Sequence, residues 1–91
     1  MGKEVVLFKS EEKHSIDEVA QFLRTLADKV EQGRVILRQG DEELTLTLPG
    51  TVTLEVKAEE ESTRKGPKHS LEIELEWRPG EEKQAGALEL G

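Results

Sequence analysis

The stretch SIDEVAQFLRTLADKVEQGRVILRQ, residues 15–39, changes its hydrophobic period at Gly33. Before Gly33 the apolar residues follow the i, i+3, i+4, i+7 spacing of one buried helical stripe, and after it they follow the two-residue period of a strand. Ser15 and Glu18 have the spacing of a capping box, so a helix is predicted to begin at Ile16. Gly33 is suited to the left-handed conformation that ends a helix. The stripe consists of Ile16, Val19, Ala20, Leu23, Leu26, Ala27 and Val30, with Phe22 on its shoulder.

Five strands are predicted, one before the helix and four after it. Residues 3–9 (KEVVLFK) form a short run rich in β-branched residues, which predicts the first strand. The other four are RVILRQ (34–39), ELTLTL (43–48), TVTLEVKA (51–58) and SLEIELEW (70–77). They are separated by Gly40-Asp41, by Pro49-Gly50 and by the polar segment EEESTRKGPKH (59–69), which is interpreted as a long loop.

The turn at Gly40-Asp41 predicts the register of the strands on either side of it. A two-residue type II′ turn, with glycine first, pairs Leu37 with Leu44 and Val35 with Leu46. It also places Arg38 opposite Glu43, so apolar residues meet on one face and opposite charges on the other.

The other two strand junctions need different connections. A two-residue loop at Pro49-Gly50 would place inward Leu48 against outward Thr51, so a three-residue connection or a bulge is expected there. For the last two strands, one register that keeps all apolar residues on one face sets Lys57 opposite Glu72.

These elements predict an α+β domain with the order β-α-β-β-β-β. One amphipathic helix would cover one face of a mainly antiparallel sheet of about five strands, which is a two-layer sandwich. The first strand could lie parallel to the second through a right-handed crossover, or at the edge beside the last strand. Trp77 would close one end of the core. Residues 1–79 are expected to form this single domain, and residues 80–91 a disordered tail.

Composition excludes several classes of function. The net charge of −7 argues against a nucleic-acid partner and against an acidic membrane surface, because both require clustered Lys and Arg. Cysteine is absent, so disulfides, thiolate metal sites and cysteine nucleophiles are excluded together. No signal-like segment and no apolar run of bilayer length occurs, so we expect an acidic, soluble, cytoplasmic protein.

Four glutamates are predicted to share the outward face of the last strands. Glu72, Glu74 and Glu76 alternate with apolar residues, and Glu55 comes from the neighbouring strand. A flat strand supplies too few wrapped oxygens for a tight calcium site. A solvated face that prevents strand aggregation is therefore favoured over a cation site, and no cofactor is expected.

Catalytic residues are not indicated. His14 precedes the helix cap and His69 lies in the polar segment, and neither has a serine, cysteine or ligand partner at a characteristic spacing. Both are interpreted as exposed histidines, and no enzymatic activity is predicted. A concave pocket that contained either histidine would favour an enzyme.

Apolar residues on the open side of the sheet are the stronger indication of function. If Val35 and Leu37 face the helix, Ile36 faces away from it. In the first strand, either Val5 and Leu7 or Val6 and Phe8 face inward, and the other pair faces outward. An exposed patch of Val6, Phe8 and Ile36 is typical of self-association or of a protein partner.

Three pieces of the sequence resemble the amphi-Trp domain family, small bacterial and archaeal domains with an amphipathic final strand that carries a tryptophan. They are VLF (6–8), EVAQFLRTLADKV (18–30) with Gly33 after it, and ELEW (74–77). The similarity spans residues 3–79 and implies a fold, but no functional residues. The apolar patch, together with the lack of indicated catalytic residues, predicts a non-enzymatic interaction domain. It would use an open sheet face or an edge strand, with a homodimer or another protein as partner. The alternative is an acidic, cation-responsive module.

Overall fold

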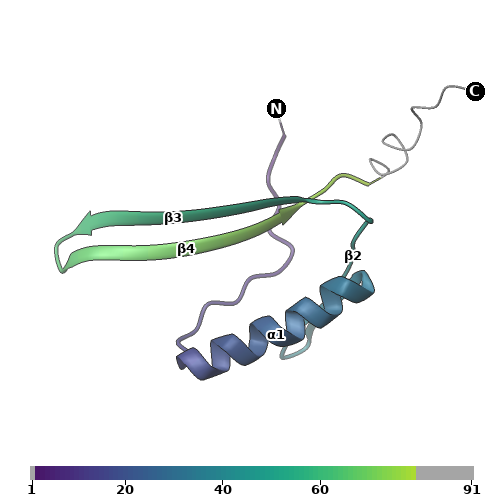
Figure 1. The fold of residues 1–91 in the computed structure, drawn as a ribbon, viewed down its shortest axis with the longest axis horizontal. Helices are drawn as coiled ribbons and strands as arrows, with labels where there is room; N and C mark the ends of the chain where they lie inside the picture. The colour runs from purple at the N-terminus through teal and green to yellow at the C-terminus, as the bar shows by residue number, and fades with distance from the viewer. Residues whose placement is uncertain (1, 80–91) are drawn as a thin grey trace, which may run out of the picture. The chain divides into compact units, whose positions relative to one another are not determined.

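The fold is α+β, with one helix followed by four antiparallel strands. A computed structural model describes residues 2–79, and the predicted tail at 80–91 lies outside the described residues. The elements are α1 (Ile16–Gln32), β1 (Arg34–Gln39), β2 (Glu42–Thr47), β3 (Thr53–Thr63) and β4 (Gly66–Glu76) (Figure 1). The chain divides between Leu48 and Pro49 into two units, which are described in turn. The expectation of a single domain over residues 1–79 stays a prediction.

Both ends of α1 are as predicted. The Ser15 hydroxyl accepts from the Glu18 N–H at 3.1 Å, and the Glu18 carboxylate accepts from the Ser15 N–H at 2.9 Å, which completes the capping box. At the other end Gly33 has φ 83°, and its N–H donates to the carbonyls of Lys29 and Val30. This left-handed conformation favours glycine because it lacks a Cβ atom.

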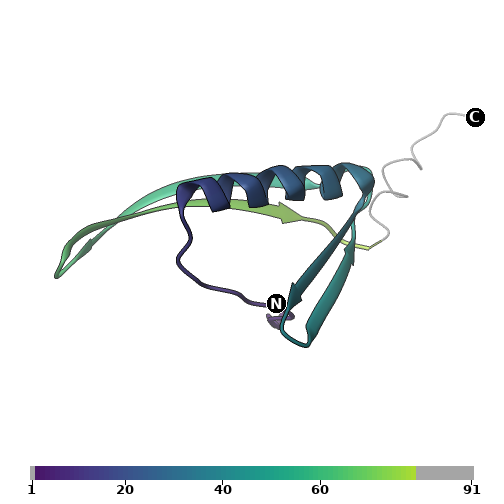
Figure 2. The same ribbon diagram turned by 90° about the horizontal axis from the view of Figure 1, so that it is seen from below.

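The hairpin of β1 and β2 has the predicted register. Val35 pairs with Leu46 and Leu37 with Leu44, and the Arg38 guanidinium donates to the Glu43 carboxylate at 2.7 Å. Gly40 has φ 59°, and in the described part of the chain only glycines have a positive φ, so Asp41 does not. A type II′ turn at Gly40-Asp41 requires a positive φ at its first central residue only. Figure 2 shows this hairpin leading away from the C-terminal end of α1.

The core of the first unit lies where α1 meets β1. Val35 is the one buried apolar side chain among residues 2–79, at 7% exposed. Leu26 and Val30, in the second half of α1, are half-buried, whereas Ile16 at its start is 81% exposed. The Leu48 N–H donates to the Gly33 carbonyl at 2.9 Å, which ties the chain after β2 to the end of the helix.

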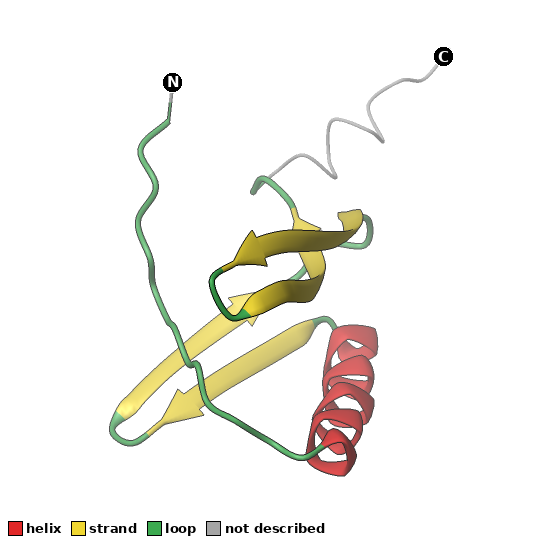
Figure 3. Ribbon diagram, turned by 90° about the vertical axis from the view of Figure 1, so that its left-hand side faces the viewer, coloured by secondary structure: helices red, strands yellow, loops and turns green. Residues whose placement is uncertain are grey.

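The second unit is a long hairpin of β3 and β4 (Figure 1), which Figure 3 shows from the side of its turn. Its register confirms Lys57 opposite Glu72. The interpretation of residues 59–69 as a long loop is wrong, because β3 continues to Thr63 and β4 begins at Gly66. Backbone hydrogen bonds form the ladder whatever the polarity of the side chains, and a turn at 64–65 followed by Gly66 with φ 113° is enough to reverse the chain.

Two strand pairings that a five-stranded sheet requires are absent from the described residues: the pairing of residues 3–9 with any strand, and the pairing of β2 with β3. The predicted five-stranded sheet and two-layer sandwich are therefore wrong. Residues 3–9 form no strand, and Val5, Val6 and Leu7 there are 65–75% exposed. β2 pairs with β1 but not with β3, so the four strands form two separate two-stranded sheets. A strand requires backbone hydrogen-bond partners as well as a suitable side-chain pattern.

Candidate functional site

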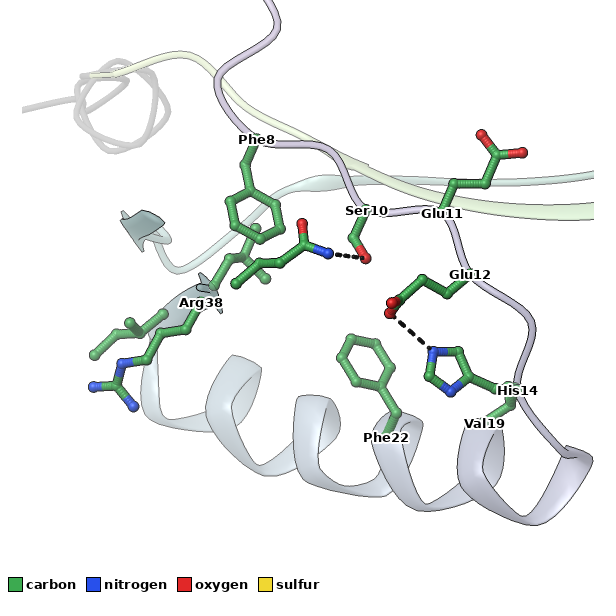
Figure 4. A pocket seen from close by; sticks show the side chains of 11 residues that line it. Phe8, Ser10, Glu11, Glu12, His14, Val19, Phe22 and Arg38 are labelled. Carbon is green, nitrogen blue, oxygen red and sulfur yellow. Dashed lines mark hydrogen bonds and ion pairs between the residues drawn. The ribbon is translucent and has the colours of Figure 1, made fainter. Parts of the chain in front are cut away.

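The predicted patch of Val6, Phe8 and Ile36 is only partly assembled in the first unit. Phe8 and Ile36 line one hollow of about 720 Å³, whereas Val6 stays outside its lining and is 75% exposed. Figure 4 shows Phe8 entering the hollow from the N-terminal segment and Phe22 entering it from α1. The other lining residues are Ser10, Glu11, Glu12, His14, Val19, Leu37, Arg38 and Gln39.

Phe22 is a residue of this hollow that the sequence did not indicate. Its position on the shoulder of the helical stripe left it without an assigned role, and it is 58% exposed. An aromatic side chain beside an apolar stripe was the available signal, because such a ring carries a large apolar area.

The hollow is also lined by His14. Because a concave pocket that contains a histidine raises the case for an enzyme, the surroundings of His14 decide whether it could act as a catalytic base. The His14 Nε2 lies 3.6 Å from a Glu12 carboxylate oxygen, and its Nδ1 lies 3.6 Å from a Glu18 oxygen. Ser10 accepts a long hydrogen bond of 3.5 Å from Gln39. No hydrogen bond between the Ser10 hydroxyl and His14 occurs in residues 2–79, so the pair that would activate a nucleophile is not assembled. The His14 side chain is 49% exposed, and this site offers no enclosed general base.

The capping box affects the charge of a carboxyl group next to His14. The hydrogen bond from the Ser15 N–H, with a second from the Ser15 side chain, holds the pKa of Glu18 below its ordinary value, and His14 adds to the effect. Glu18 is therefore an anion that stabilises the start of the helix. Its role in the structure is capping.

The hairpin of the second unit has one apolar face. Its cross-strand pairs are Leu54 with Leu75, Val56 with Ile73, and Ala58 with Leu71. Leu54, Val56, Leu71 and Ile73 are 58–69% exposed, so residues of their own unit leave most of this face uncovered. We call these six side chains the apolar face of the hairpin. Trp77 follows the last residue of β4 and is half-buried.

The four predicted acidic residues lie on the opposite face, but they are not equivalent. Glu55 is directly opposite Glu74, whereas Glu72 is opposite Lys57 and Glu76 is opposite Thr53. A hydrogen bond with Glu55 and repulsion from the Glu55 carboxylate raise the pKa of Glu74, and Glu76 and Glu72 add smaller repulsions. Among residues 2–79 no group of three acidic, histidine or cysteine side chains could hold a metal ion. The arrangement is a repulsive pair of carboxylates beside Lys57, whose ammonium forms an ion pair with Glu59 at 3.9 Å.

The fold and the two faces of the last hairpin define a class of small α+β domain, with one amphipathic helix and an amphipathic final hairpin that ends beside the only tryptophan. The chain belongs to the Amphi-Trp domain family, whose family model matches residues 1–91. No curated protein and no solved structure gives a significant match. Within residues 2–79, no helix is long and apolar enough to cross a membrane.

Proposed function

We propose that this protein is a non-enzymatic interaction domain that self-associates through its β3–β4 hairpin. The observation that carries the proposal is the row of Leu54, Val56, Leu71 and Ile73 on one face, each more than half exposed. An isolated two-stranded hairpin is marginally stable in water, so a hairpin with one apolar face gains stability from further strands or from a covering surface. Association with another copy provides further strands when two hairpins meet at an edge, and a covering surface when they meet face to face.

The exposed apolar surface is large enough to drive weak association. A fully buried aliphatic side chain contributes about 1.5–3 kcal/mol, so four that are roughly 60% exposed contribute about 4–7 kcal/mol per copy when covered. This is comparable with the cost of bringing two molecules together, which is about 4–15 kcal/mol. Association should therefore be weak and depend on protein concentration.

Charge opposes this association and makes it sensitive to salt. The chain has a net charge of −7, so two copies repel each other at low ionic strength. Added sodium chloride screens that repulsion beyond a distance of about 8–10 Å. Self-association through the apolar face should therefore increase with salt, whereas association through ion pairs alone would decrease.

The hollow of Phe8, Phe22 and Ile36 is the second surface available to a partner. It lies in the first unit, and its Ile36 side chain is half-buried. An Ile36→Glu variant separates the two surfaces. Self-association that persists in this variant assigns the contact to the hairpin, and its loss assigns the contact to the hollow.

Sedimentation velocity over a wide range of protein concentration tests the proposal. The variant Val56→Lys places a charge on the apolar face in the middle of β3, and Ser70→Lys places the same charge on the opposite face, across from Glu59. Weight-average mass should rise with concentration in the wild type and in Ser70→Lys, but not in Val56→Lys. A strict monomer at every concentration and salt would refute self-association.

A further inference from the structure

We propose that two copies of this chain join edge to edge along β3, antiparallel and centred on Val56, to form one four-stranded sheet. The inference rests on the proposed function and specifies its partner and its register. Each copy would contribute its β3–β4 hairpin, with the two β3 strands in the middle and the β4 strands outside. A closed two-fold contact of this kind uses the same surface on both copies.

An outer edge of β3 is available in the second unit. In the described part of the chain β3 pairs only with β4, so its second edge has backbone donors and acceptors without a strand partner. β3 runs for 11 residues and has no proline. Long open edges of this kind are templates for pairing with another chain.

The outer edge of β4 is less suited to pairing. Pro67 lies within β4 and pairs with Ser62 of β3. Proline has no N–H, and it is accommodated in a sheet where its nitrogen faces away from the neighbouring strand. The missing donor therefore lies at the outer edge of β4. This difference between the edges selects β3.

The charges of β3 select one register for the contact. Centring on Val56 places Glu55 of each copy opposite Lys57 of the other, and Leu54 opposite Ala58. Centring on Glu55 would place two Glu55 side chains together, and centring on Lys57 would place two lysines together. Centring on Ala58 would set Glu55 against Glu61. Because like charges directly opposite each other destabilise a sheet, the Val56 register is favoured.

This register also relieves a strain that each hairpin carries alone. Glu55 faces Glu74 across the hairpin, and the carboxylates repel each other. In the joined sheet Glu55 would lie between Glu74 of its own copy and Lys57 of the second copy. The parity keeps the apolar residues of both copies on one face, so each hairpin gains two further strands without placing an apolar residue opposite a charged one.

Cysteine cross-linking tests the register, since the chain has no cysteine of its own. In the Val56→Cys variant the two thiols would lie directly opposite each other, with Cα atoms about 4.5–5.5 Å apart, within the range of a disulfide. Leu54→Cys is the matched control, because Leu54 lies on the same face and is 60% exposed against 59% for Val56. Its two thiols would be four residues out of register, or about 13 Å apart. Leu71→Cys tests pairing through β4.

Under mild oxidation of the full chain, Val56→Cys should form a disulfide-linked dimer at least about tenfold faster than Leu54→Cys. A mixture of Leu54→Cys with Ala58→Cys should also cross-link, because those positions oppose each other. Equal rates for Val56→Cys and Leu54→Cys would overturn the register. Faster cross-linking of Leu71→Cys than of Val56→Cys would overturn the choice of edge.

Charge reversal tests the same contact without a covalent bond. Lys57→Glu and Glu55→Lys should each weaken self-association by about tenfold or more, because each replaces two attractive pairs with two repulsive ones. A mixture of the two variants should associate like the wild type, since one copy then has two glutamates and the other two lysines. Glu55→Lys is the informative single variant, because it gains an attraction to Glu74 within its own hairpin and yet should lose association.

The outcomes separate this inference from the function on which it rests. A wild type that is monomeric at all concentrations would refute both. A wild type that self-associates, with neither charge variant weakened and no rescue in the mixture, would refute the β3 contact and leave self-association standing. Circular dichroism of each variant confirms that it has folded before its association is measured.

Discussion

Replacing Val35 with alanine should destabilise this protein more than the same replacement at Val56. The two residues are chemically identical, but Val35 is 7% exposed in the contact between α1 and β1, and Val56 is 59% exposed on the hairpin. Valine to alanine removes two methylene equivalents, which are worth about 1.6 kcal/mol when fully buried. Scaled by burial, the loss is about 1.5 kcal/mol at Val35 and about 0.7 kcal/mol at Val56.

A cavity increases the difference, because the surroundings of Val35 close over the missing methyl groups only partly. We expect up to about 1 kcal/mol more at Val35, and nothing comparable at Val56, which borders solvent. The difference between the two variants should therefore be about 1–2 kcal/mol. That is a large share of the stability of a small domain.

Urea unfolding with two probes measures this difference. Circular dichroism at 222 nm follows α1 in the first unit, and fluorescence of Trp77, the only tryptophan, follows the second unit. The measurement is made on dilute protein, where copies are separate, and then on concentrated protein. Self-association should raise the cost of Val56→Ala at high concentration and leave that of Val35→Ala unchanged. Equal costs in dilute protein would refute the burial argument.

Three further predictions concern the helix cap, the acidic face and the first turn. Ser15→Ala should cost about 1 kcal/mol of helix stability by circular dichroism, since it removes one hydrogen bond of the capping box, and an unchanged urea midpoint would contradict this role. The raised pKa of Glu74 means that its neutral form stabilises the hairpin, so this contribution is present at acid pH and is lost as pH rises through the raised pKa. Glu74→Gln should therefore raise the Trp77 urea midpoint at neutral pH, whereas Glu72→Gln, which changes a carboxylate that has Lys57 rather than a glutamate opposite it, should not raise it. A lower midpoint for Glu74→Gln would refute the repulsive pair. Gly40→Ala should lower the free energy of unfolding by about 1–2 kcal/mol, because φ is 59° at this position. A Cβ atom there would meet nothing within 4 Å, so any loss comes from the backbone conformation. Unchanged stability would contradict this reasoning.

The local parts of the fold follow from the sequence because they depend on contacts a few residues apart. The capping box joins residues three positions apart, Gly33 ends the helix by its own conformation, and the Gly40-Asp41 turn sets the register of β1 against β2. For the last hairpin, apolar parity and opposite charges indicated the Lys57 and Glu72 pair. Each of these features is decided by interactions that the nearby sequence displays directly.

The candidate surfaces were predictable in part. The alternation of β4 showed that glutamates and apolar residues occupy opposite faces, and it assigned Glu72, Glu74 and Glu76 to one of them. The predicted register with Lys57 opposite Glu72 also implies Glu74 opposite Glu55, but other registers keep the same apolar face, so the alternation alone did not fix these pairs. Nor did it show that Phe22 and Phe8, 14 positions apart, line one hollow.

Tertiary structure alone decided which segments pair. Residues 3–9 have a strand pattern but no strand partner among residues 2–79, and β2 and β3 follow each other in the chain without joining one sheet. Conversely, the polar residues 59–63 and 66–69 are strands because the ladder of β3 and β4 continues through them. Side-chain periodicity specifies which face a strand would bury, but the hydrogen bonds that make it a strand come from another segment, whose distance in the chain the pattern does not encode.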